Sequence, residues 1–282
     1  GIGTWRLYIR DAAAFDQGSL TNWALEFDDS VQGPTTFESD HPIVFLNTFN
    51  DSIKNDISIK GRIRIYDVHN GICAAGDSAF SYEGPIDIAK RGWYSASLPQ
   101  ESYNITLLSS TLGDTSSALL GMPEENDWQL NAMYNDKSMI RNSMMYKLFS
   151  EMGHYAARVR HCEVFLNGDY LGTYLFNEKI RRTKNRLNIS KLTEKDTIGD
   201  DLTGGYIFRH DYNINKGWLS DVGPPGCPTN KAHFEFEYPS AAAILPSQKE
   251  YLRTWVDTLE QRLFSNNFKD SLLGYRPLID IR

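Results

Sequence analysis

The stretch that most constrains the fold is residues 160–179, because it contains two strand-like runs on either side of Asn167-Gly168. An Asn-Gly pair between apolar runs is the strongest short-range hairpin signal, since a type I′ turn needs positive φ at both central residues. Alternate residues from Cys162 to Leu166 point to one face of the first strand. The returning run, residues 170–176, is apolar at nearly every position, which predicts a strand covered on both faces.

The predicted hairpin ends at Asn177-Glu178-Lys179, after which the sequence becomes polar and basic. A buried strand that delivers a carboxylate to its end is a common way to place a ligand-contacting residue. Glu178 is therefore a candidate for ligand binding, with Asn177 beside it. The alternative, which spacing alone favours, is that these are the solvated last residues of a central hairpin.

Four strand-like runs precede this hairpin, and together they predict a meander of antiparallel strands. These runs span residues 41–47, 61–68, 83–91 and 101–108. The acids at 124, 125 and 127 follow them and are interpreted as solvated loop charges rather than a metal or glycosidase site.

The clearest helix follows Asp136, a good N-cap, and covers residues 137–152. Its apolar residues recur at four-residue spacing from Ile140 to Met152, which predicts a face packed on the core. Arg141 lies off this face, and either stays solvated or bridges to a carboxylate of the neighbouring sheet. A second helix is predicted to begin at the capping box Ser247–Glu250.

Charge and hydropathy exclude several classes of function. The formal net charge is −7 and the pI is about 5.4, which argues against a nucleic-acid groove or an anionic membrane surface. No run approaches the roughly 20 apolar residues of a membrane span. The three cysteines lack the spacing of a metal site, and no residue is assigned as a metal ligand.

The first 27 residues resemble the end of a known β-sandwich. Gly3-Thr4-Trp5 and the run from Leu20 to Leu25 are similar to the last two strands of the P domain, which follows the catalytic domain of proprotein convertases. We therefore expect residues 1–27 to be the C-terminal hairpin of a P domain, with a polar linker at 28–40. The rest of that sandwich is expected before Gly1.

The remainder, residues 41–282, resembles the spore coat protein H (CotH) kinase family. The segments that carry this resemblance occur in one order along the chain. They are residues 120–128, 134–142, 152–155, 166–174, 178–179, 200–206 and 237–239. The resemblance implies a secreted or cell-surface atypical protein kinase that transfers phosphate from ATP, with Mg²⁺, to an extracellular protein.

The implied fold is α+β: a protein-kinase-like N-lobe, made of an antiparallel sheet and an αC-like helix, followed by the start of a C-lobe. In that fold residues 170–176 lead into the hinge, and Asn177 and Glu178 lie near the adenine. Arg141 is then the candidate for an ion pair or a contact on the phosphate side. The family's catalytic and metal-binding aspartates are expected beyond Arg282, so the domain is expected to be truncated at its C-terminus and no catalytic residue is assigned.

One motif departs from the family pattern. Family members carry Pro-Lys-Lys-Ser-Tyr where this chain has Pro99-Gln100-Glu101-Ser102-Tyr103, so both lysines are replaced. Lys90 and Arg91, on the preceding strand, are the candidates to take over phosphate binding. The departure favours an alternative function, a catalytically inactive kinase-like module for extracellular binding or adhesion.

Overall fold

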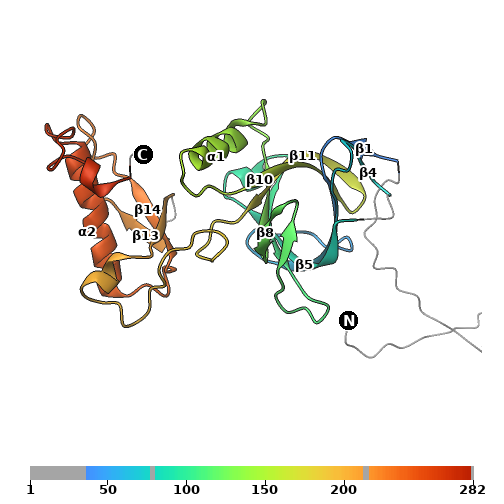
Figure 1. Ribbon diagram of the computed structural model, residues 1–282, viewed down its shortest axis with the longest axis horizontal. Helices are drawn as coiled ribbons and strands as arrows, with labels where there is room; N and C mark the ends of the chain where they lie inside the picture. The colour runs from blue at the N-terminus through green and yellow to red at the C-terminus, as the bar shows by residue number, and fades with distance from the viewer. Residues whose placement is uncertain (1–35, 77–79, 212–215, 281–282) are drawn as a thin grey trace, which may run out of the picture. The chain divides into compact units, whose positions relative to one another are not determined.

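The computed structural model describes residues 36–76, 80–211 and 216–280 (Figure 1). The chain divides into two units, Gly1–Ser30 and Val31–Arg282, and every described residue belongs to the second. The P-domain hairpin predicted at residues 1–27 therefore lies outside the described residues.

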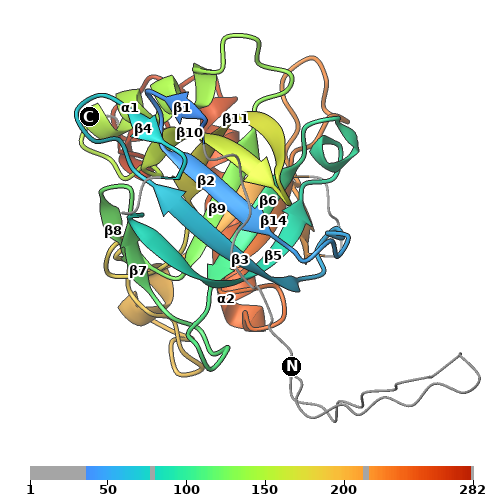
Figure 2. The same ribbon diagram turned by 90° about the vertical axis from the view of Figure 1, so that its right-hand side faces the viewer.

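Seven strands of the second unit form a closed barrel in the order β10-β11-β9-β6-β5-β3-β2. Neighbouring strands are antiparallel except for β10 and β2, which pair in parallel and close the sheet, with Val164 opposite Val44. Figure 2 shows β2 lying beside β3 in this wall. The strands are β2 (Ile43–Asn47), β3 (Ile59–Tyr66), β5 (Tyr82–Arg91), β6 (Ser102–Leu107), β9 (Asp127–Ala132), β10 (Val159–Leu166) and β11 (Asp169–Glu178).

The predicted hairpin is confirmed as β10 and β11. The two strands pair from Val159 opposite Asn177 to Leu166 opposite Asp169, and Asn167 and Gly168 have φ values of 51° and 91°. The predicted meander of four strands is also confirmed, because β2, β3, β5 and β6 pair in succession. Strand β9, which the sequence did not predict, continues it by pairing with β6.

Side chains from alternate strand positions fill the barrel interior, as the alternation in the sequence indicates. Trp128, Tyr174 and Phe176 are the largest of the fully buried ones. Cys162 and Val164 belong to the same core, so the face assigned to them from the sequence is confirmed. Because the sheet is closed, its inner side chains pack against one another, and no helix is needed to cover that face.

A second, smaller assembly follows the barrel. Strands β12 (Ile207–His210), β14 (His233–Tyr238) and β13 (Gly217–Leu219) form a sheet in that order. Helix α2 (Pro246–Leu263) lies beside it (Figure 1) and buries Leu252 and Val256 in one cluster with Trp218 and Phe236. The helix predicted at Ser247 therefore exists and begins one residue earlier.

The remaining elements are short. They are the paired strands β1 (Glu38–Ser39) and β4 (Cys73–Ala74), the paired strands β7 (Ser117–Leu119) and β8 (Met122–Glu125), helix α1 (Arg141–Glu151), and the 3₁₀ turns η1 (Ser95–Ser97), η2 (Asp200–Thr203) and η4 (Arg276–Leu278).

The expected fold class, a protein-kinase-like N-lobe with an αC-like helix and the start of a C-lobe, is wrong. The described residues are mostly β-structure, with a closed seven-stranded barrel and two α-helices. The parallel pairing of β10 with β2 is what overturns the expectation, because it joins the ends of the meander into a cylinder. Strand β11 is accordingly a barrel strand, paired with β10 and β9, rather than a link to a hinge.

Helix α1 also differs from the expectation. It begins at Arg141, four residues later than predicted, and Asp136 accepts a hydrogen bond from the Arg141 backbone N–H at 3.0 Å. None of its residues is buried, and the apolar face from Met144 to Met152 is about half exposed. Among the described helices, none combines the length and the apolar character that crossing a bilayer would require.

Candidate functional site

The outer face of the barrel and the three-stranded sheet border a cleft of about 860 Å³. Strands β5, β6, β9 and β11 supply the barrel wall, and β12 and β14 supply the facing wall. The barrel wall is polar because positions that alternate with the buried core residues point outward there. Its residues are Arg91, Asn104, Gln129, Asn131, Asn177 and Lys179.

Amide side chains on the barrel wall form one continuous series of hydrogen bonds. The Arg91 guanidinium donates to Asn131 Oδ1, and Asn131 Nδ2 donates to Asn177 Oδ1 at 2.6 Å. Asn177 Nδ2 donates to Gln129 Oε1 at 3.2 Å, and Gln129 Nε2 donates to Asn104 Oδ1 at 3.0 Å. Every bond runs in the same direction, so each amide is polarised by its neighbour, beginning from a cation. This wall is therefore a hydrogen-bonded network that begins at the Arg91 guanidinium.

Two cations on this wall are partly buried. Burial lowers the pKa of Arg91 and of Lys179 from their ordinary values, because removal of water disfavours the charged form. Among the residues that the structure describes, neither side chain is in an ion pair. Arg91 remains charged, because an arginine pKa has a wide margin above neutrality. The wall thus holds positive charge that a bound anion would stabilise.

The facing wall carries acids around one arginine. Arg209 lies 2.7 Å from a Glu235 carboxylate oxygen, 3.4 Å from one of Asp211 and 3.6 Å from one of Glu237. The carboxylate of Glu237 also acts electrostatically on Arg91 and Lys179 across the cleft. Phe208 and Ile180 add apolar surface to the same cleft.

Three of the five predicted site residues line this cleft: Asn177, Glu178 and Arg91. The Glu178 carboxylate is fully buried and already has several partners. It accepts hydrogen bonds from Arg158 Nη1 at 2.7 Å and from the Tyr155 hydroxyl at 3.2 Å, and Arg186 Nε lies 4.0 Å away. A nucleotide contact from Glu178 stays a prediction. The side-chain amide of Asn177 is a member of the hydrogen-bonded series on the barrel wall.

The other two predicted residues lie elsewhere. Lys90 points to the opposite side of β5 from Arg91 and pairs with Glu101 at 2.6 Å. Arg141 is 75% exposed at the start of α1, where it pairs with Asp136 at 3.4 Å. Neither lines the cleft.

The structure also shows what Gln100 and Glu101 contact at the two positions where family members carry lysines. Glu101 neutralises Lys90, so its charge is balanced locally. Gln100 Nε2 donates to the carbonyl oxygens of Leu171 and Thr173 at 3.3 and 3.0 Å, on either side of Gly172. Both residues therefore support the barrel wall.

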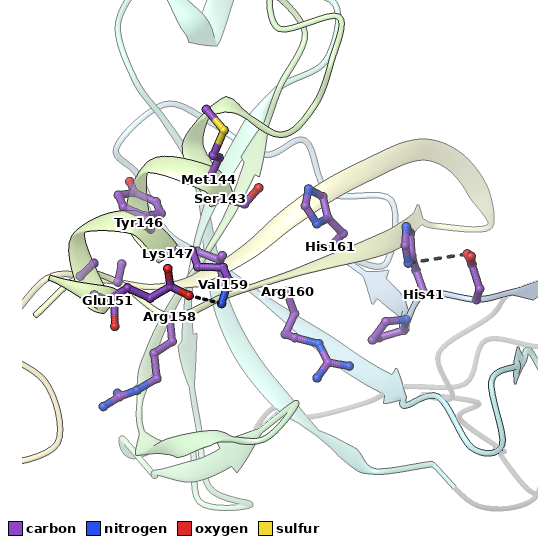
Figure 3. Close-up of a pocket in the computed structure, with 15 residues that line it drawn as sticks. His41, Ser143, Met144, Tyr146, Lys147, Glu151, Arg158, Val159, Arg160 and His161 are labelled. Carbon is purple, nitrogen blue, oxygen red and sulfur yellow. Dashed lines mark ion pairs between the residues drawn. The ribbon is translucent and has the colours of Figure 1, made fainter. Parts of the chain in front are cut away.

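A second hollow, of about 680 Å³, lies between α1 and the start of β10 (Figure 3). The rings of His41 and His161 stack there, with their centroids 6.0 Å apart. Its three long cations all take part in ion pairs: Lys147 with Glu151, Arg158 with Glu178 and Arg160 with Asp67. Because these charges are already compensated, the first cleft is the stronger candidate for an anionic ligand.

Potential metal ligands and thiols do not point to another centre. Within residues 36–76, 80–211 and 216–280, no three histidine, cysteine or acidic side chains gather as a metal site would require. All three cysteines are free thiols, Cys73 and Cys162 buried and Cys227 exposed.

The sequence alone did not identify four residues of the barrel wall as site residues: Lys179, Asn131, Gln129 and Asn104. Only Asn104 lies in a predicted strand, where it alternates with the buried residues Tyr103 and Ile105. Gln129 and Asn131 belong to β9, which the sequence did not predict. What the sequence did not show is that this outer face borders a cleft.

The model of a protein family described as CotH kinase protein matches residues 88–281. This stretch includes the residues that line the cleft from Arg91 to Glu237, but not Asn55 and Asp56. No curated protein matches the chain.

Proposed function

Because this chain belongs to the CotH kinase protein family, we propose that its cleft binds a nucleoside triphosphate, with the phosphates against Arg91 and Lys179. The observation that carries the proposal is that two partly buried cations share one wall without an ion pair among the described residues. A phosphate oxygen is a strong partner for such cations, since charge-assisted hydrogen bonds replace the water they have lost.

The described residues fit both parts of a magnesium nucleotide. The two cations of the barrel wall suit the phosphates. In nucleotide sites Mg²⁺ is held by one or two carboxylates together with phosphate oxygens, and Glu237 is the carboxylate that acts on both cations. ATP with Mg²⁺ supplies a transferable phosphoryl group when bound. The chain's own contribution is to bind and orient it.

We extend the proposal to phosphate transfer onto a protein outside the cell or on its surface. This part rests on the family resemblance, which implies ATP as donor and a protein as acceptor. Secretion is likewise a proposal.

The second candidate is a catalytically inactive binding module of the same family. The ion pair of Lys90 with Glu101 favours it, because the lysines expected at positions 100 and 101 are replaced and the neighbouring lysine is occupied. Nucleotide binding separates the two candidates.

Replacing Arg91 with alanine is expected to weaken binding of Mg²⁺-ATP about 10- to 100-fold, which is the effect of losing one or two charge-assisted hydrogen bonds. Isothermal titration calorimetry on the wild type and the variant measures this change. Arg91→Lys keeps the positive charge but loses the several N–H donors of the guanidinium. Its affinity for Mg²⁺-ATP is expected to lie between those of the wild type and Arg91→Ala.

The matched control is Arg141→Ala, an exposed arginine outside the cleft. It is expected to bind Mg²⁺-ATP like the wild type. Equal losses in the two alanine variants would contradict the assignment of this cleft. A wild type that does not bind ATP would favour the inactive module.

Binding is also expected to depend on pH through Lys179. Burial lowers the pKa of free Lys179, and a bound phosphate raises it again, so the complex holds more protons than its components. Affinity for ATP should therefore fall as the pH rises through the lowered pKa. Titrations between pH 7 and 10 test this, and Lys179→Arg, which stays charged, should flatten the profile. Identical profiles for both proteins would contradict the role of Lys179.

A further inference from the structure

Trp93 is the most exposed large apolar residue among those described, with 88% of its surface accessible. It follows β5 by two residues and borders the same cleft as Arg91 and Lys179. Within the described part of the chain, its indole takes part in no ring stacking and no cation–π contact. An indole is a large apolar surface to leave in water, and this one lies beside charge that suits an anion.

The turn that carries Trp93 is held by its own backbone and by short polar side chains. Gly92 has a φ of 97°, and a side chain there would meet the Ser95 hydroxyl. The 3₁₀ turn η1 follows, and Ser97 donates from its backbone N–H and its hydroxyl to the Tyr94 carbonyl at 3.1 and 2.7 Å. These bonds define the turn without drawing the indole into the core, so the ring is left available at the cleft.

A ligand for this part of the cleft needs an anionic group and a flat aromatic group joined together. The cations on the barrel wall take the first, and an accessible indole takes the second. A nucleotide has both, and every nucleobase offers a face for stacking. Resting on the proposed function, we propose that Trp93 stacks on the base of the nucleotide whose phosphates Arg91 and Lys179 bind.

The test compares two ligands on two variants. Trp93→Ala is expected to weaken ATP binding about tenfold, the usual effect of removing one base–aromatic stack, and to leave inorganic tripolyphosphate binding unchanged. Tyr94→Ala is the matched control, because Tyr94 is 66% exposed on the same turn but does not border the cleft. It should bind both ligands like the wild type.

Fluorescence gives an independent readout. ATP should quench the tryptophan emission of the wild type, and this change should be absent in Trp93→Phe, which keeps an aromatic ring and most of the affinity. Tripolyphosphate should quench neither protein.

The outcomes separate this inference from the proposed function. If Trp93→Ala binds ATP like the wild type while Arg91→Ala loses affinity for both ligands, the stacking role is wrong and the phosphate site stands. If the wild type binds neither ligand, both proposals fail. Equal weakening of both ligands by Trp93→Ala would show that Trp93 supports the turn rather than the base.

Discussion

Replacing Glu178 with alanine is expected to lower the free energy of unfolding by about 3–5 kcal/mol, because it removes a carboxylate that lies 4.0 Å from the buried Arg186 guanidinium. The side chains of Glu178 and Arg186 are both completely inaccessible. Arg158, which is 45% exposed, can turn toward water when its partner is lost, but Arg186 cannot. Urea denaturation of the wild type and the variant measures the difference.

Glu151→Ala is the matched control for this prediction. Glu151 is also a paired carboxylate, 2.8 Å from Lys147, but it is 62% exposed on α1. Surface pairs of this kind contribute at most about 0.5 kcal/mol. If Glu178→Ala were as mild as Glu151→Ala, the buried ion pairs would not hold the end of β11, and a direct ligand role for Glu178 would gain support.

Replacing Trp128 with alanine is expected to cost about 3–5 kcal/mol as well, through loss of buried apolar surface and creation of a cavity. Trp128 is fully buried in the barrel, and its ring centroid lies 5.4 Å from that of Phe176. Its indole N–H donates to the Glu125 carbonyl at 3.1 Å, and the Arg186 guanidinium lies over the ring. Truncation therefore also leaves Glu125 without this donor.

Trp93→Ala provides the same chemical change at an exposed site and is expected to alter stability by no more than about 0.5 kcal/mol. Thermal unfolding followed by circular dichroism compares the two variants. A small loss at Trp128, similar to that at Trp93, would mean that the barrel interior is not the main source of stability. The loss of stability in Trp128→Phe should lie between those of Trp128→Ala and Trp93→Ala, since phenylalanine fills part of the cavity.

Local structure was largely readable from the sequence. The Asn167-Gly168 turn, the alternation that places Cys162 and Val164 in the core, and the helix near Ser247 all depend on residues within a few positions of each other. Turn geometry and side-chain alternation are short-range properties, so one sequence suffices to predict them.

Only part of the candidate site could be predicted from the sequence. Asn177 and Glu178 were both expected near a ligand, but consecutive strand residues point to opposite faces. The structure places the amide of Asn177 in the outer hydrogen-bonded series and the carboxylate of Glu178 among Arg158, Tyr155 and Arg186. Which face borders a cleft depends on where β12 and β14 pack, and no local pattern specifies that.

The closure of the sheet was decided only by tertiary structure. Strands β2 and β10 are separated by more than a hundred residues, and each reads locally as an ordinary apolar strand. Their parallel pairing turns the meander into a barrel whose interior is filled by its own side chains. The apolar face of α1, which the sequence assigned to the core, then has no open sheet to cover and stays exposed. An amphipathic pattern predicts which side of a helix can be buried, but the surface that would bury it comes from distant parts of the chain.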